Sequence, residues 1–175
     1  MRFLSTPLAG LFEVESDAHV DERGSFRRSW CAEAFASAGL AFQPVQASLS
    51  GNLRCFTLRG LHYQIAPHAE QKLVRCVQGR AWDVVVDVRE DSPTRWHHHA
   101  VELDAARGNA IFVPRGFAHG FLTLQDDTTV EYLIDTAFAP AAATGLRFSD
   151  PRLAIAWPAT PQVVSGRDAA WPLLG

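Results

Sequence analysis

The stretch Thr57-Leu58-Arg59-Gly60-Leu61-His62-Tyr63-Gln64 is followed, eight positions after its end, by Lys72-Leu73-Val74-Arg75-Cys76. Both segments mix core-type and polar residues as β-strands do, and they bring an imidazole and fixed cations onto neighbouring strands. A base that is neutral near pH 7, beside fixed positive charge, is what the removal of a proton next to a carbonyl requires. The two segments therefore predict a β core and a candidate catalytic centre.

Short strand-like segments continue on either side of this stretch, and turn-forming residues separate them. The segments are 11–16, 25–30, 82–88, 110–113, 120–124 and 128–134. Only 31–39, which is alanine-rich and closed by a glycine, is typical of a helix. The proline-containing tail, 148–175, is irregular. This pattern predicts an all-β sandwich or barrel with one short helix and an irregular C-terminal tail.

Length and composition are typical of one globular domain. The chain has 175 residues, of which 47% are hydrophobic and 20% are charged, so we expect a single domain, 1–175. A net charge of −3 gives no electrostatic reason to expect nucleic acid. Three cysteines without a CxxC spacing indicate reduced thiols, and no segment is typical of a signal peptide or a membrane span. We expect a cytoplasmic protein without nucleic-acid or membrane partners.

Two spacings resemble the signature motifs of the cupin superfamily, whose fold is a double-stranded β-helical jelly roll. They are Gly60-x5-Ala66-x-His68-x3-Lys72-x6-Gly79 and Gly108-x5-Pro114-x-Gly116-x2-His119. In metal-binding cupins the first motif supplies two histidines and a glutamate, and the second supplies one histidine. Here Ala66 takes the position of the first histidine and Lys72 that of the glutamate. Because an ammonium group cannot donate a lone pair, we expect a cupin without a metal, in which His68 and His119 are the remaining motif histidines.

A second resemblance covers nearly the whole chain in ordered blocks. The blocks are Asp21 to Phe26, Leu58 to Gln64, Lys72 to Cys76, Val84 to Arg89, Ser92 to Thr94, Pro114 to Phe121, Asp150-Pro151, Trp157-Pro158 and Ser165 to Asp168. Together they resemble the dTDP-4-dehydrorhamnose 3,5-epimerase family, metal-independent cupins that invert carbons flanking the 4-keto group of a nucleotide-linked sugar. The resemblance implies that no cofactor is needed.

The resemblance also implies roles for four residues at the chemical centre. His62 matches the general base and Asp168 the carboxylate paired with it, although Arg167 stands where the family usually has lysine. A carboxylate on the far nitrogen fixes the tautomer of an imidazole. Lys72 matches the group that holds the enolate oxygen at C4, and Tyr132 the tyrosine that returns a proton on the opposite face. Inversion needs this second group, because a base working on one face would restore the starting configuration.

Substrate-binding positions follow from the same resemblance. Arg23 and Arg59 match residues that bind the diphosphate, where a guanidinium suits bidentate contact with phosphate oxygens. His119 matches a pocket position, and Phe26 and Gln46 match residues that line the nucleoside and sugar pocket. In the family, the strand from Arg23 to Phe26 reaches into the neighbouring subunit. The resemblance therefore implies a homodimer with an exchanged N-terminal strand.

Several positions at the nucleotide end depart from the family pattern. Arg28 stands where a glutamate is usual, Ser48 where an asparagine is usual, and Ala137 where an aromatic residue is usual. A reversed charge and a lost stacking partner would each change how a base is recognised. The pattern predicts a divergent epimerase that acts on another nucleotide sugar, or one that inverts only C3 or only C5.

The leading interpretation is thus an epimerase of 4-keto-6-deoxy nucleotide sugars in deoxysugar biosynthesis. Proton abstraction and reprotonation of an enolate would invert C3, C5 or both. Two alternatives stay open at this point. One is a cupin that binds a nucleotide sugar without catalysis, and the other is a metal-dependent cupin enzyme.

Overall fold

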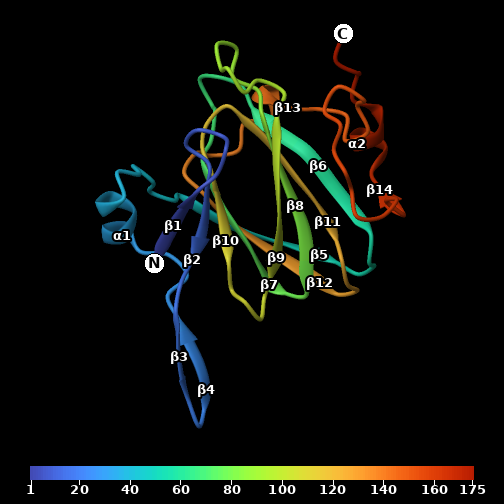
Figure 1. Cartoon of the computed structure of the whole chain (residues 1–175). Helices are drawn as coiled ribbons and strands as arrows, with labels where there is room; N and C mark the ends of the chain where they lie inside the picture. The colour runs from blue at the N-terminus through green and yellow to red at the C-terminus, as the bar shows by residue number, and fades with distance from the viewer.

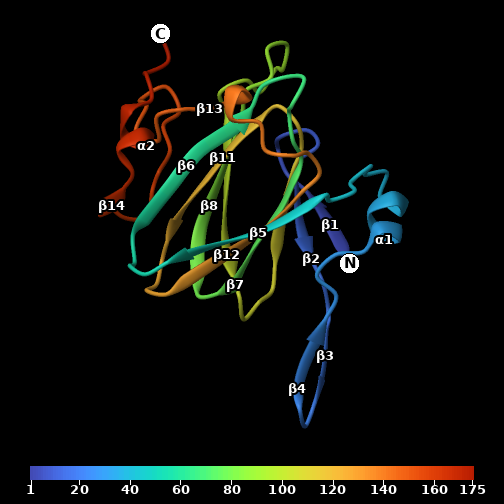
Figure 2. The same cartoon turned by 180° about the vertical axis from the view of Figure 1, so that it is seen from behind.

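The computed structural model describes residues 1–175, and its strands form two facing sheets and a separate hairpin (Figures 1 and 2). The first sheet has the order β1 (Arg2–Ser5), β2 (Phe12–Glu15), β10 (Ala110–Val113), β7 (Lys72–Gln78), β12 (Thr128–Ile134) and β5 (Gln46–Asn52). The second has the order β13 (Ala143–Gly145), β6 (Thr57–Gln64), β11 (Phe117–Thr123), β8 (Arg80–Asp87) and β9 (His98–Asp104), with β14 (Val163–Val164) paired to β6. All pairs are antiparallel except β14 with β6.

The main core lies between the two sheets. Alternate residues of each strand point inward, so apolar side chains from β7, β10 and β12 meet those from β8 and β11. This core consists of Leu8, Leu11, Val74, Cys76, Ala81, Val85, Leu103, Ile111, Val113, Phe117, Phe121 and Val130. The arrangement confirms the expected cupin jelly roll.

Both outer faces are covered as well. Phe35 of helix α1 (Ala32–Ser37) is fully buried against Leu73 and Phe112 on the outside of the first sheet. On the outside of the second sheet, Leu146 and Leu153 of the C-terminal segment pack on residues of β6 and β8. Because β8 is covered on both faces, its run of valines, 84–86, is buried throughout.

The prediction of one short helix and an irregular tail was wrong in part. The tail contains a second helix, α2 (Gly166–Ala170), and the strand β14. A 3-10 turn, η1 (Pro140–Ala142), precedes the tail. A five-residue helix and a two-residue strand are too short to leave a periodic pattern in the sequence. None of the helices is long and apolar enough to cross a lipid bilayer.

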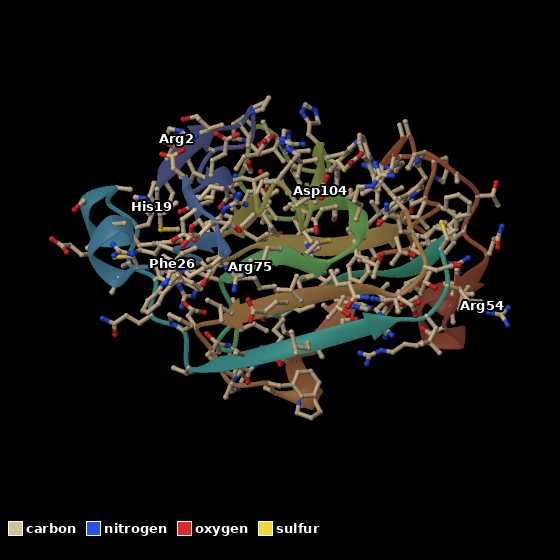
Figure 3. All side chains as sticks on the ribbon, turned by 90° about the horizontal axis from the view of Figure 1, so that it is seen from below. Arg2, His19, Phe26, Arg54, Arg75 and Asp104 are labelled. Carbon is tan, nitrogen blue, oxygen red and sulfur yellow. The ribbon has the colours of Figure 1, made fainter.

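A two-stranded hairpin projects from the body of the molecule (Figure 1). It consists of β3 (Ala18–Asp21) and β4 (Gly24–Arg27), whereas the sequence predicts only one strand here, 25–30. Its apolar side chains lie in solvent: Phe26, labelled in Figure 3, is 73% exposed and Val20 is 76% exposed. This exposure explains why the strand β3 left no inward–outward alternation in the sequence and was not predicted.

Candidate active site

A cavity of about 620 Å³ opens between the two sheets, and β6 contributes more of its wall than any other strand. Strands β5, β7, β11, β12, β13 and β14, helix α2 with its N-cap, and the loops beside β7 and β12 supply the rest. The lining includes Gln46, Ser48, Arg59, His62, Tyr63, Gln64, Glu70, Lys72, His119, Tyr132, Phe138, Arg167 and Asp168. Seven of the nine residues predicted for the site, Asp168 among them, therefore line one cavity.

His62 and Asp168 are joined by a short polar contact in this cavity. The Nε2 atom of His62 lies 2.6 Å from Oδ1 of Asp168. The carboxylate is buried, with 5% of its side chain exposed, whereas 43% of the imidazole is exposed. An ionised carboxylate only accepts hydrogen bonds, so Nε2 carries the proton and Nδ1 keeps its lone pair. The pair thus presents a base of fixed tautomer.

The pKa of His62 lies below its ordinary value of 6.5. Burial is the main cause, and the positive charge of Lys72 adds to it, whereas the hydrogen bond that Nε2 donates to Asp168 acts in the opposite direction. The carboxylate raises the pKa of His62, but burial lowers it by more. The result is an imidazole that is neutral, and so able to accept a proton, near pH 7.

Asp168 is held by the short helix α2 that the sequence did not predict. Ser165 caps this helix, and its hydroxyl accepts a hydrogen bond from the Asp168 backbone N–H at 3.1 Å. The second carboxylate oxygen, Oδ2, accepts from the Gly60 backbone N–H at 3.3 Å. Asp168 is thereby fixed to the same strand that carries His62.

Lys72 begins strand β7, and only 10% of its side chain is exposed. Its Nζ donates to the backbone oxygen of His62 at 3.3 Å and lies 2.9 Å from Oε1 of Glu70. Lys72 is also the only lysine in the chain, among fifteen arginines. A compact ammonium group therefore stands beside the candidate base.

Tyr132 lies on β12, in the first sheet, whereas His62 lies on β6, in the second sheet. Burial raises the pKa of the Tyr132 hydroxyl above its usual range, and the charge of Asp83 adds to this effect. The hydroxyl therefore stays protonated at neutral pH. The two residues offer a proton acceptor and a proton donor from opposite walls of the cavity.

A second imidazole–carboxylate pair, which the sequence did not reveal, lies deeper in the cavity wall. Nε2 of His119 lies 2.8 Å from Oδ2 of Asp83, and both side chains are buried. The His119 ring also packs edge-on against Tyr132, with 5.8 Å between ring centroids. Antiparallel pairing of β8 with β11 brings Asp83 to this position, and no spacing along the chain reports that pairing.

Arg59 lies on β6 with an exposed side chain that is held at its base. Its Nε donates to Oδ1 of Asn52 at 2.8 Å, and Nη2 donates to the backbone oxygen of Gly51 at 3.4 Å. The Nη1 atom of the guanidinium has no protein partner and remains available to a ligand. Gln46 lines the same cavity from strand β5.

Arg23 and Phe26 are not brought to this cavity within one chain. Both belong to the projecting hairpin, where Arg23 is paired with Asp21 at 2.5 Å. Their side chains are largely exposed. Within the single chain they form no part of the candidate site.

The three positions that depart from the family pattern do not all lie at the cavity. Ser48 lines the cavity and Ala137 lies between two lining residues, whereas Arg28 lies outside it and points to Cys31 at 3.8 Å. Arg167 lines the cavity and stacks on Trp171, with 5.2 Å between its guanidinium carbon and the ring centroid.

The two histidines left in the cupin metal motifs do not come together in one site. His119 is buried in the cavity wall, whereas His68 lies in an exposed loop outside the lining. No group of three or more His, Cys, Asp or Glu side chains is arranged to hold a metal ion.

Comparison with known proteins gives one consistent family. The model of a family described as dTDP-4-dehydrorhamnose 3,5-epimerase matches residues 5–175. A Sinorhizobium fredii protein of that name is 41% identical, with 99% of this chain and 90% of that protein covered. A dTDP-4-dehydrorhamnose 3-epimerase of Streptomyces niveus is 35% identical over 96% of this chain and 81% of its own length. The Bacillus anthracis dTDP-4-dehydrorhamnose 3,5-epimerase, solved with TDP and PPi bound, superposes with a TM-score of 0.96 at 35% identity, covering 99% of both chains.

Proposed function

The chain belongs to the dTDP-4-dehydrorhamnose 3,5-epimerase family, and from this premise we propose that it inverts C3, C5 or both of a 4-keto-6-deoxy nucleotide sugar. The observation that carries the proposal is the contact of 2.6 Å between His62 and Asp168 in the cavity that also contains Lys72 and Tyr132. A neutral base, a cation and a protonated hydroxyl are the groups that such an inversion needs.

The first step is removal of a proton from the carbon next to the C4 carbonyl. Nδ1 of His62 takes the proton, and the electrons of the broken C–H bond form the C=C bond of an enolate. The carbonyl electrons move onto the C4 oxygen, which becomes negative. Asp168 stabilises the imidazolium through Nε2, at 2.6 Å.

Lys72 stabilises the negative charge that develops on the C4 oxygen. An ammonium group that is already in place needs little reorganisation when the charge appears, and a mostly buried site strengthens its effect. The 10% exposure of its side chain and its bond to the His62 backbone keep it next to the base.

Tyr132 completes the inversion by giving its hydroxyl proton to the same carbon from the opposite face. The raised pKa of Tyr132 keeps this proton in place until the enolate forms. Exchange with solvent then removes the proton from His62 and restores that of Tyr132. The reaction is an isomerisation, so no net proton or electron is consumed.

The arginines and the polar side chains around them would bind the nucleotide diphosphate. Arg59 has a free guanidinium edge at the cavity, which suits the oxygens of a diphosphate. His119 and Gln46 would contact the phosphates or the sugar, as their positions in the lining support. The residues at the rim of the cavity, including Ser48, would select the nucleobase of the substrate.

We further propose a homodimer in which the projecting hairpin supplies Arg23 and Phe26 to the cavity of the neighbouring subunit. The 73% exposure of Phe26 and the 76% exposure of Val20 on the same hairpin support this, because neighbouring exposed apolar side chains mark protein–protein contacts. Light scattering of the purified chain should give twice its mass of 19.2 kDa, and F26A should weaken substrate binding.

Three free cysteines support a reducing, cytoplasmic location, and we propose that residues 1–175 act as one domain.

Incubation with dTDP- and CDP-linked 4-keto-6-deoxyglucose in D₂O tests the proposed function. Deuterium should enter C3, C5 or both, as NMR of the sugar resolves, and H62A should abolish the exchange. Thermal stabilisation by these sugars without any exchange would instead support a binding protein without catalysis.

A further inference from the structure

Glu70 is a buried carboxylate that none of the proposed catalytic steps uses. It lines the active-site cavity, with 6% of its side chain exposed, and its Oε1 lies 2.9 Å from Nζ of Lys72. Its other oxygen, Oε2, is buried without a hydrogen-bond partner. A buried carboxylate oxygen without a partner is unfavourable for stability, and such groups are often retained for function.

Glu70 and the His62 backbone occupy two of the three N–H donors of the Lys72 ammonium group. An ammonium group has three N–H donors. One points to Oε1 of Glu70 at 2.9 Å and one to the backbone oxygen of His62 at 3.3 Å. A single N–H therefore remains for an oxygen of the substrate, and its direction is fixed by the other two.

The segment that carries Glu70 is itself held firmly. The Gln71 backbone N–H donates to Oδ1 of Asp135 at 2.8 Å, and the Asp135 backbone N–H donates to the Gln71 oxygen at 3.3 Å. Arg115 binds Oδ2 of Asp135 at 2.5 Å and the backbone oxygen of Ala69 at 3.0 Å. Residues on both sides of Glu70 are thus fixed, Gln71 to Asp135 and Ala69 to Arg115.

From these contacts we propose that Glu70 is a positioning residue, which orients the Lys72 ammonium so that its one free N–H meets the C4 oxygen. The inference rests on the proposed function and adds a residue to it. Glu70 does not touch the reacting atoms. Its effect reaches the substrate only through Lys72, by a hydrogen bond in which the carboxylate oxygen accepts.

Two amide variants separate the hydrogen bond from a purely structural role. E70Q keeps an acceptor oxygen at the same reach, so kcat should stay within about threefold of wild type. E70N has the same chemistry but is one methylene shorter and cannot reach Nζ, so kcat should fall about tenfold or more, which is the effect of one charge-assisted hydrogen bond. KM should be little changed in both, because the contact matters most when negative charge develops.

A second readout needs no activity. Because Lys72 is the only lysine, the ¹⁵N-labelled chain has one side-chain ammonium signal. This signal should be protected from solvent exchange in wild type and E70Q, and should broaden or vanish in E70N.

Glu131 provides the matched control. It pairs with Arg75 across the same two strands, β7 and β12, but outside the cavity lining, so E131Q and E131N should leave kcat unchanged. Absence of exchange by wild type would reject the proposed function, while the ammonium signal would still test the position of Lys72. Exchange by wild type with equal kcat for E70Q and E70N, or an ammonium signal that is the same in both, would reject the role of Glu70.

Discussion

His62 and Asp168 are 106 positions apart in the chain, and their side chains meet at 2.6 Å. Asp168 also binds the Gly60 backbone N–H with its second oxygen, two residues before His62. The carboxylate is therefore fixed to the strand of the imidazole at two points. This arrangement sets which nitrogen of His62 carries the proton.

D168N tests this tautomer. The amide nitrogen of Asn would donate to Nε2 of His62, so Nδ1 would carry the proton and lose its role as the base. We expect kcat for deuterium incorporation to fall about 10²- to 10⁴-fold. The thermal midpoint of the variant should stay near that of wild type, because the amide oxygen still accepts from Gly60. A loss of less than tenfold would show that Asp168 does not control the base.

The pH dependence of kcat/KM should report the lowered pKa of His62. The base works when it is neutral, so the rate should rise with pH and level off, with a midpoint below the ordinary value of 6.5. The Tyr132 hydroxyl, whose pKa is raised, should add no loss of activity below its ordinary value of 10.0. Initial rates of C3 and C5 exchange across pH 5 to 9 measure the midpoint. A midpoint above 6.5 would contradict the conclusion that burial lowers the pKa of His62.

R59A should raise KM about tenfold or more and change kcat little. The free edge of the Arg59 guanidinium is expected to bind phosphate oxygens, which are present equally in the ground state and the transition state. Arg54 is the matched control, an exposed arginine outside the cavity lining (Figure 3), and R54A should leave KM unchanged. Equal effects of the two substitutions would indicate general electrostatic attraction instead of a specific contact.

Much of the fold could be predicted, because buried strands leave a pattern in the sequence. The bounds predicted for β10 and β12, Ala110–Val113 and Thr128–Ile134, are those observed. The hairpin strand β3 was missed because its side chains lie in solvent. Helix α2 was missed because it has only five residues.

The site was predictable only where the family motifs name a residue. His62, Lys72 and Tyr132 lie in such motifs, and the structure places them in one cavity. Asp83 lies in a run of core residues, and only the pairing of β8 with β11 brings it to His119. Glu70 was likewise missed, because its contact with Lys72 depends on the side-chain rotamer, which the sequence does not report.

G120A should destabilise the fold because β6 and β11 approach closely behind the site. A Cβ atom on Gly120 would lie 2.6 Å from the backbone oxygen of Arg59 and 2.8 Å from Cα of Gly60. Backbone atoms cannot move aside easily, so we expect a loss of roughly 1–3 kcal/mol in the free energy of unfolding, measured by urea denaturation. G166A is the control, since nothing lies within 4 Å of a Cβ there, and it should be neutral or slightly stabilising. Equal stability of G120A and G166A would show that the strands can separate.

H119A should destabilise the protein more than its lost contacts with Tyr132 would suggest. The substitution leaves the Asp83 carboxylate, which is fully buried, without its donor at 2.8 Å. Leaving a buried carboxylate without its partner typically costs about 3 kcal/mol or more, whereas replacing the carboxylate together with its partner costs less. The double variant D83N/H119N should therefore be more stable than H119A in urea denaturation. R2A breaks an exposed pair with Asp17 and should leave the urea midpoint unchanged. If D83N/H119N were no more stable than H119A, the unpaired carboxylate would not be the cause, and loss of packing around His119 would account for the effect.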